Sequence, residues 1–262
     1  MTDDLQVYRY GPPGPLAVLA VHGLTGHGQR WAPLANRYLP DVTVAAPDLI
    51  GHGRSPWSAP WTIEVNATAL AKVIESDQPA GPVVVVAHSF GGAVALQLAV
   101  MRPDLVKALV LLDPAVGLDG GWMRTIADAM LASPDYPDRA EARAEKISGS
   151  WGEVDAWLLD NDLDEHLIAL PNGRFGWRIS LPAVMSYWSE LARPIPIPPK
   201  GIPTTVVRAT RTSPPYVSAE LTTALRDRLG TDFALRDFDC DHMVAQAKPE
   251  ETAALIRESL QD

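Results

Sequence analysis

The stretch Val83-Val84-Val85-Val86-Ala87-His88-Ser89-Phe90-Gly91-Gly92 decides how this chain folds, and an alanine-rich run over residues 93–100 follows it. Four consecutive valines are typical of a strand buried on both faces, because β-branched side chains pack well in a pleated sheet. The glycines favour a sharp turn, and the alanine-rich run favours a helix. The stretch therefore predicts a strand, a tight turn and a helix, with one serine at the apex.

Ser89 is a candidate nucleophile because of its place in this turn. Such a turn lifts a serine hydroxyl above the sheet, and the backbone N–H groups that follow it face any oxyanion that forms there. The usual pattern is Gly-x-Ser-x-Gly, and here Ala87 replaces the first glycine. A methyl group is the smallest intrusion at that crowded position, so we treat Ala87 as a tolerated variant. A serine in a glycine-rich turn can also be an ordinary turn residue, but the flanking strand and helix favour the nucleophile.

The composition narrows the class of protein. The 262 residues suffice for one large α/β domain or two small ones, and 47% hydrophobic residues are ordinary for a soluble globule. A net charge of −10 argues against nucleic acid and anionic membrane surfaces as main partners. The single cysteine, Cys240, excludes an internal disulfide and a cysteine-based metal cluster.

The beginning of the chain carries no targeting signal that we recognise. Met1-Thr2-Asp3-Asp4 is acidic, and no apolar segment of the signal-peptide type follows it. No apolar run is long enough to span a bilayer. We therefore expect a soluble protein of the cytoplasm.

The order of the predicted elements indicates an α/β fold. Short apolar runs predict strands over residues 5–10, 16–21, 42–46, 83–86, 107–112, 204–209 and 233–238. Helical spacing falls between them, over residues 31–39, 62–77, 93–100, 218–229 and 249–260. Strands that alternate with helices imply a mostly parallel sheet with right-handed crossovers.

This alternation stops between residues 115 and 201, where no clear buried strand is found. Helical spacing recurs there over residues 122–131, 138–146 and 181–191, and an excursion of this length is typical of a helical lid. We therefore expect a core domain of residues 1–114 and 202–262, with a lid of residues 115–201 inserted after the strand that runs up to Asp113.

Several polar residues follow directly after predicted strands. They are His22, Asp48, Ser89, Asp113 and, after the last strand, His242. Ligands of open parallel sheets bind outside the carboxyl ends of the strands, so we expect these side chains to gather at one edge of the sheet.

With these residues in view, the chain resembles the α/β-hydrolases, and more narrowly the actinobacterial esterases and lipases of that fold. The resemblance rests on the elbow at Ser89, on two early loops and on a segment near the end of the chain. These three segments are His22-Gly23-Leu24, residues 47–55 (PDLIGHGRS) and Asp241-His242-Met243. The match extends over nearly the whole chain and is weakest in the lid.

The resemblance implies a role for each matching residue. Ser89 would attack the substrate carbonyl, and His242 would take its proton and later give it to the leaving group. The backbone N–H groups of Leu24 and Phe90 would hold the oxyanion. No cofactor or metal takes part in such a reaction.

The acid of the triad is where the sequence departs from the family. The usual aspartate follows the strand after the lid, but residues 208–217 contain no carboxylate and Ser213 stands near its place. A minority of the fold carries the acid one strand earlier, and Asp113 occupies that position. We therefore predict that Asp113 orients His242. The competing interpretation is that Asp113-Pro114 is only a turn at the end of a strand.

Other residues receive simpler interpretations. His22, His52, His88 and Asp48 are expected to support the loops of the site, and His27 and His166 to lie on the surface or in the lid. Asp160 to Glu165 resembles the start of a calcium loop, but Glu165 replaces the required glycine and Pro171 the final glutamate. We therefore interpret this segment as a solvated acidic turn and predict no metal site.

The predicted function is that of a serine hydrolase that cleaves carboxylic esters through an acyl-enzyme. Its partner would be a small-molecule ester, with an apolar acyl chain if the lid tryptophans line the pocket. These are Trp122, Trp151, Trp157, Trp177 and Trp188. Thioester, lactone or carbon–carbon bond hydrolysis on the same triad stays open, as does a binding protein of the same fold. A serine at the elbow disfavours dehalogenase and epoxide-hydrolase chemistry, since both need a carboxylate nucleophile there.

Overall fold

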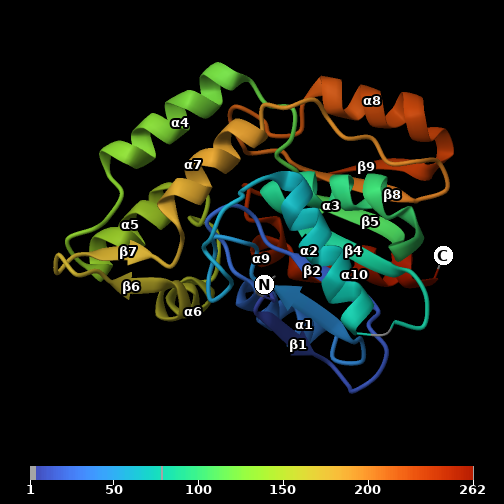
Figure 1. The fold of residues 1–262 in the computed structure, drawn as a ribbon, viewed down its shortest axis with the longest axis horizontal. Coiled ribbons are helices and arrows are strands. Elements are labelled where there is room, and N and C mark those ends of the chain that lie inside the picture. The colour runs from blue at the N-terminus through green and yellow to red at the C-terminus, as the bar shows by residue number, and fades with distance from the viewer. Residues whose placement is uncertain (1–3, 78, 262) are drawn as a thin grey trace.

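A seven-stranded sheet runs through the protein in the computed structural model, which describes residues 4–77 and 79–261 (Figure 1). The acidic start of the chain, Met1-Thr2-Asp3, lies outside the described residues. The strands are β1 (Val7–Tyr10), β2 (Val18–Val21), β3 (Val44–Pro47), β4 (Val83–His88), β5 (Val106–Leu112), β8 (Thr204–Ala209) and β9 (Phe233–Phe238). Their order across the sheet is β1-β3-β2-β4-β5-β8-β9, and only β1 is antiparallel to its neighbour.

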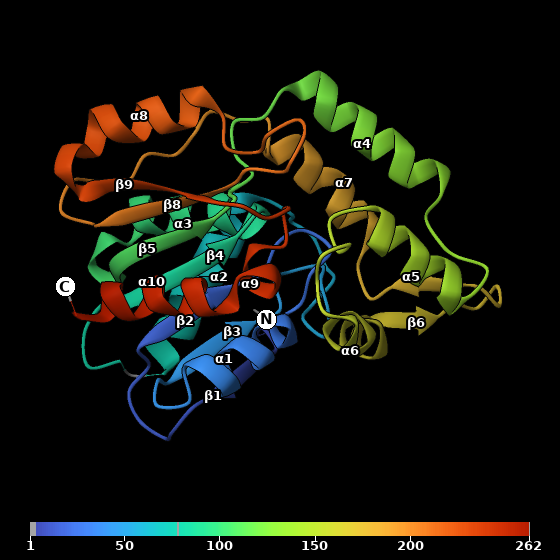
Figure 2. The same ribbon diagram turned by 180° about the vertical axis from the view of Figure 1, so that it is seen from behind.

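Helices cover both faces of the sheet, as the front and back views show (Figures 1 and 2). One face carries α2 (Ile63–Ser76), α3 (Phe90–Met101) and α8 (Ala219–Leu229). The other carries α1 (Ala32–Tyr38), the short α9 (Val244–Ala247) and α10 (Pro249–Gln261). The predicted α/β architecture is thus confirmed, and the predicted strands and the helices of the core lie within a few residues of their observed bounds.

The buried strand β4 shows why the valine run is so informative. Val83 and Val85 pack into the hydrophobic core on one side of the sheet, and Val84 and Val86 pack into the core on the other. All six residues of the strand are buried. Successive side chains of a strand point to opposite faces of the sheet, so a run that packs into a hydrophobic core on each face is apolar at every position.

The strand ends in a strained turn at Ser89, whose φ of 52° and ψ of −121° lie outside the regions that L-residues favour. Helix α3 begins at the next residue and passes very close to β2. A Cβ atom at Gly91 would lie 2.6 Å from the carbonyl oxygen of His22 and 2.8 Å from that of Val21. The glycine therefore allows the helix to start against the backbone of the neighbouring strand.

Residues 115–201, which we call the insert, lie beyond the carboxyl ends of the strands, to the left in Figure 1. They contain α4 (Gly120–Ala132), α5 (Arg139–Ser148), α6 (Ala156–His166) and α7 (Leu181–Glu190). Strands β6 (Leu167–Ala169) and β7 (Phe175–Trp177) form a separate antiparallel pair. The division into a core domain and a lid of residues 115–201 remains a prediction.

The prediction of a solvated acidic turn at residues 160–165 is wrong. These residues lie within helix α6, and Asp162 is only 3% exposed. Its partners, described with the site, come from elsewhere in the chain. The short hairpin of β6 and β7 and the helix α9 were also not predicted.

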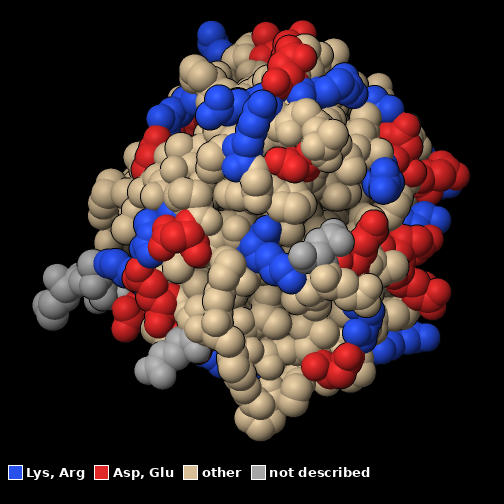
Figure 3. Space-filling view, turned by 90° about the vertical axis from the view of Figure 1, so that its right-hand side faces the viewer, with Lys and Arg blue, Asp and Glu red and all other residues tan. Residues whose placement is uncertain are grey.

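The surface carries charges of both signs. On the face opposite the insert, acidic and basic side chains are intermixed (Figure 3). Within residues 4–77 and 79–261, no helix combines the length and the apolar character needed to cross a membrane.

Replacing Gly91 with alanine is expected to destabilise the protein. Alanine favours a helix by about 1 kcal/mol over glycine, but its Cβ would overlap two backbone oxygens that cannot move without shifting β2. Overpacking of this kind costs about 1–3 kcal/mol, so we expect a net loss. Urea unfolding measures it, with Gly81→Ala as the control because nothing lies within 4 Å of a Cβ there. A Gly91→Ala variant as stable as Gly81→Ala would contradict the close packing.

Candidate active site

Three of the predicted side chains meet at the carboxyl ends of the strands. Ser89 follows β4, Asp113 follows β5, and His242 lies in the loop after β9. His242 Nε2 is 2.9 Å from Ser89 Oγ, and His242 Nδ1 is 2.6 Å from Asp113 Oδ2. The imidazole therefore stands between the hydroxyl and the carboxylate, at hydrogen-bond distance from both.

Asp113 is fully buried and firmly held. Its backbone N–H donates to the carbonyl of Val207 at 2.7 Å, and its Oδ1 accepts from the N–H of Ala209 at 3.2 Å. Its φ is +43°, an uncommon value for a residue other than glycine. These contacts turn Oδ2 towards His242, whereas Ser213, near the usual place of the acid, is exposed.

Two further rings fix the loop that carries His242. The ring of Tyr216 stacks on the imidazole of His242, with centroids 4.0 Å apart. His88 Nε2 lies 2.7 Å from the carbonyl oxygen of His242. Burial holds the pKa of His88 well below its usual range, so the ring is neutral and its single proton sits on Nε2 to make this bond. His88 thus supports a loop of the site, as predicted, whereas Tyr216 was not predicted as a residue of the site.

The loop that contains Leu24 passes close over Ser89. A Cβ atom at Gly23 would lie 2.9 Å from that of Ser89, so only glycine permits this approach. Thr25 has a φ of +60°, and its N–H donates to His52 Nε2 at 3.3 Å. Burial lowers the pKa of His52 to about 4, which leaves Nε2 free to accept. His52 therefore holds the loop of Leu24, again in a supporting role.

His22 is likewise a neutral imidazole that accepts a hydrogen bond from a backbone N–H group. Its Nε2 accepts from the N–H of Leu49 at 2.9 Å, and burial holds its pKa well below the usual range. Asp48 accepts from the N–H groups of Gly28 (2.7 Å) and Arg54 (2.8 Å). Both residues thus hold backbone rather than face the hydroxyl of Ser89.

A cavity of about 500 Å³ opens at Ser89 and His242. Leu24 lines it, and the insert supplies much of its wall. The insert residues on this wall include Ile126, Ala129, Met130, Tyr136, Glu145, Lys146, Trp151, Trp177 and Trp188. Three of the five predicted tryptophans therefore line the cavity. Trp122 instead packs against Tyr216, with ring centroids 5.1 Å apart, and Trp157 is 48% exposed.

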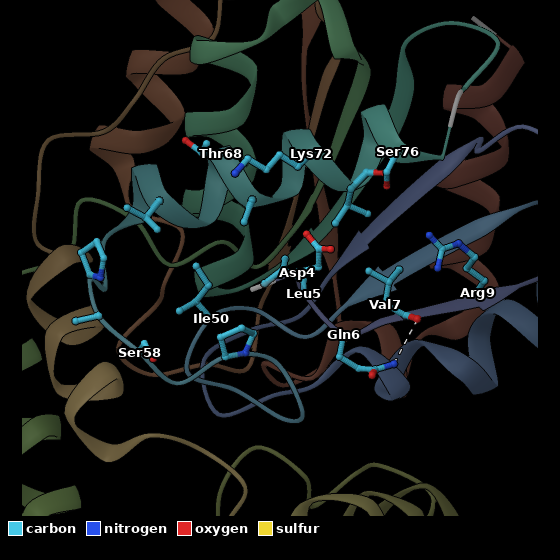
Figure 4. Close-up of a pocket in the computed structure, with 16 residues that line it drawn as sticks. Asp4, Leu5, Gln6, Val7, Arg9, Ile50, Ser58, Thr68, Lys72 and Ser76 are labelled. Carbon is cyan, nitrogen blue, oxygen red and sulfur yellow. Dashed lines mark hydrogen bonds between the residues drawn. The ribbon is translucent and has the colours of Figure 1, made fainter. Parts of the chain in front are cut away.

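A larger cavity of about 770 Å³ lies elsewhere, between the segment that leads into β1, residues 56–60 and helix α2 (Figure 4). Thr68, Lys72 and Ser76 of α2 lie along it. None of the predicted site residues lines this cavity. Size alone is thus a poor guide to the site in this molecule.

Asp162 of α6 joins the insert to the core through a buried charge cluster. Its Oδ1 accepts from His27 Nε2 at 2.9 Å and from Arg30 Nε at 2.5 Å. Its Oδ2 accepts from Arg30 Nη2 at 3.2 Å and from the ammonium of Lys146. The nearby rings of His27 and His166 stack at 4.7 Å, and both are buried. The prediction of a surface or lid position is therefore wrong for His27, whereas His166 lies in helix α6 of the insert.

Acidic residues near His242 are held by arginines. Asp237 pairs with Arg208 at 2.8 Å, and Asp239 pairs with Arg211 at 2.8 Å. Arg211 also reaches Glu153 of the insert, again at 2.8 Å. In the described part of the chain, no three His, Cys, Asp or Glu side chains are grouped so as to hold a metal ion.

Removing the charge of Asp162 is expected to destabilise the fold. Asp162→Asn leaves Arg30 and Lys146 buried without a counter-charge, and breaking a buried pair in this way costs about 3–5 kcal/mol. Asp164→Asn is the control, because Asp164 lies in the same helix, is 66% exposed and pairs only at the surface with Arg139. We expect it to cost less than about 1 kcal/mol. Equal midpoints of urea unfolding for the two variants would show that the cluster does not stabilise the fold.

Several known proteins resemble this chain in sequence or in structure. The chain is 64% identical to lipase LipV of Mycobacterium tuberculosis (strain ATCC 25618 / H37Rv) over 260 residues, which cover 99% of both chains. Among solved structures it resembles E-2-(acetamidomethylene)succinate hydrolase with a TM-score of 0.81 and 22% identity, over 98% of this chain and 95% of the other. A marine microorganism esterase matches with a TM-score of 0.74 and 22% identity, over 98% of each. Residues 18–255 match the family model described as the alpha/beta hydrolase family, and the chain belongs to that family.

Proposed function

We propose that this protein hydrolyses small-molecule carboxylic esters, with Ser89 as nucleophile, His242 as general base and acid, and Asp113 as the orienting carboxylate. The observation that carries the proposal is the placement of His242, 2.9 Å from Ser89 Oγ and 2.6 Å from Asp113 Oδ2. The relative with 64% identity is named a lipase, which agrees with ester cleavage.

The geometry supports a two-step reaction. Ser89 Oγ attacks the ester carbonyl while His242 Nε2 takes the hydroxyl proton, and the resulting oxyanion accepts from the N–H groups of Leu24 and Phe90. The tetrahedral intermediate then expels the alcohol, which receives the proton from His242. A water molecule attacks the acyl-enzyme in the same way, and its proton returns through His242 as the acid leaves and Ser89 is restored.

The position of Asp113 explains how one imidazole can serve both steps. A carboxylate at Nδ1 keeps the proton of the neutral ring on that nitrogen, so Nε2 is free to accept from the serine. It also stabilises the imidazolium that forms during attack. Because Asp113 is fully buried and both of its oxygens are engaged, it holds this orientation without competition from water.

The cavity wall favours an ester with an apolar portion over the other candidate reactions. Ile126, Met130 and Trp188 from the insert, with Leu24 from the core, offer apolar surface near Ser89. We propose that the insert acts as a lid, because it supplies these residues. Thioesters, lactones and carbon–carbon bonds remain alternatives on the same triad. A purely binding function is disfavoured, since binding needs no histidine between a serine and a buried carboxylate.

Ser89→Ala is expected to abolish ester hydrolysis. Removing the nucleophile leaves only the oxyanion donors and the pocket, so the rate should fall by at least about a thousandfold. Release of p-nitrophenol from esters of several acyl lengths measures the loss. An organophosphonate should label wild type at Ser89, as peptide mapping by mass spectrometry would show, and should leave Ser89→Ala unlabelled. Full activity in Ser89→Ala would refute the proposed triad.

Asp113→Asn tests the acid against the usual family position. The amide favours the wrong tautomer of His242, and comparable substitutions in Ser-His-Asp enzymes lower kcat by about ten-thousandfold. Ser213→Ala is the matched control, since its exposed side chain stands near the usual place of the acid. We expect Ser213→Ala to retain wild-type turnover of the same ester. If Asp113→Asn stays within a few-fold of wild type, another carboxylate must orient His242.

A further inference from the structure

The cavity that opens at Ser89 is also lined by two largely buried cations that the proposed reaction does not use. Arg30, from the core, and Lys146, from helix α5 of the insert, both line it. Their side chains are 8% and 11% exposed, respectively. Buried cations are costly unless an anion compensates them, so the charge around these two residues decides what they can bind.

The neighbouring carboxylate compensates only one of the two charges. Each oxygen of Asp162 already accepts two donors, from His27, Arg30 and Lys146, which fills the acceptor capacity of a carboxylate. Burial lowers the pKa of His27, so this ring adds no charge at neutral pH. The cluster therefore holds two cations and one anion, and carries one net positive charge.

The two cations keep donors that Asp162 does not accept. The ammonium of Lys146 lies 4.2 Å from the ring centroid of Trp151 and 4.5 Å from that of Trp177. Arg30 Nη2 donates to the carbonyl of Thr25 at 3.1 Å, while Nη1 finds no acceptor among residues 4–77 and 79–261. An anion in the cavity would supply the missing acceptor and the missing charge.

Among the residues that the structure describes, Glu145 is the one carboxylate on the cavity wall, and it does not fill this need. Glu145 precedes Lys146, but its side chain is exposed and its Oε1 accepts from the hydroxyl of Tyr136 at 2.6 Å. Water screens a charge in such a position far more than it screens the buried Arg30 and Lys146. Asp162 is absent from the wall of the cavity at Ser89 and borders a separate cavity of about 340 Å³, which Arg30 and Trp151 also line.

From this arrangement we infer that Arg30 and Lys146 form an anion subsite, so that the protein selects esters that also carry a carboxylate. The inference rests on the proposed ester hydrolysis at Ser89 and adds the class of substrate. Arg30 lies next to the loop of Leu24, since its Nη2 holds the carbonyl of Thr25. The subsite thus begins beside the group proposed to bind the oxyanion, within reach of a small substrate.

The test compares esters that differ only in charge. Mono-p-nitrophenyl esters of dicarboxylic acids of four to eight carbons are paired with p-nitrophenyl esters of neutral acids of equal length. A second series places the carboxylate on the alcohol side and compares 3-(butanoyloxy)propanoate with butyl butanoate. In whichever series shows the larger preference, we expect wild type to favour the charged ester by about tenfold or more in kcat/KM. A preference of this size corresponds to one charge-assisted hydrogen bond.

Variants at one position of α5 decide which residue sets the preference. Lys146→Met should reduce the ratio of charged to neutral kcat/KM to a few-fold or less, and Lys146→Arg should keep it. Arg143→Met is the control, because Arg143 lies in the same helix and pairs with Asp160 at 2.9 Å outside the cavity wall. It should leave the ratio and the activity on the neutral ester unchanged.

The results that would overturn the anion subsite differ from those that would refute ester hydrolysis. A ratio near one in wild type for both series, or a preference that survives in Lys146→Met, would overturn the anion subsite while leaving ester hydrolysis intact. Loss of Ser89-dependent turnover on every ester would refute the proposed function instead. Calorimetry with Ser89→Ala, comparing the monoamide of adipic acid with hexanamide, checks the subsite without turnover or a variant of the cluster. Equal affinity for the charged and the neutral amide would also overturn it.

Discussion

The contact between Asp113 Oδ2 and His242 Nδ1, 2.6 Å long, is the constraint on which the site depends. It joins residues 129 positions apart, from the ends of strands that are not neighbours, because β8 lies between β5 and β9. The carboxylate reaches across this gap from a fully buried position, held by the backbone of β8 through Val207 and Ala209. The parallel register of β5, β8 and β9 therefore fixes the orientation of the His242 imidazole. This orientation brings Nε2 within hydrogen-bond distance of Ser89 Oγ.

The features that could be predicted from the sequence are those with local causes. The valine run and the glycines after it determine a strand and an elbow within ten residues, so their prediction succeeded. Asp113 could be proposed because the segment after β8 holds no carboxylate, and the structure places it beside His242. Its role as the acid remains a proposal until its substitution is measured.

The features that could not be predicted depend on partners far away in the chain. Residues 160–165 were interpreted as a solvated turn because they resemble a calcium loop without its glycine and final glutamate, yet Asp162 meets Arg30 from 132 residues away. Helix α6 is stable there because the fold supplies cations for its buried face. Tyr216 was missed for a similar reason, since its stacking on His242 leaves no pattern in the residues around it.

Three residues other than glycine have positive φ angles in the described chain, namely Thr25, Ser89 and Asp113, and all three belong to the site. Such conformations cost about 1–3 kcal/mol each and persist only where the surroundings enforce them. The surroundings include His52 at Thr25 and the backbone of Val207 and Ala209 at Asp113, none of which is proposed to touch substrate. Selection for the reaction is therefore expected to act also on buried residues of the sheet. A substitution that merely loosens their packing would let the strained backbone relax and move the reacting groups apart.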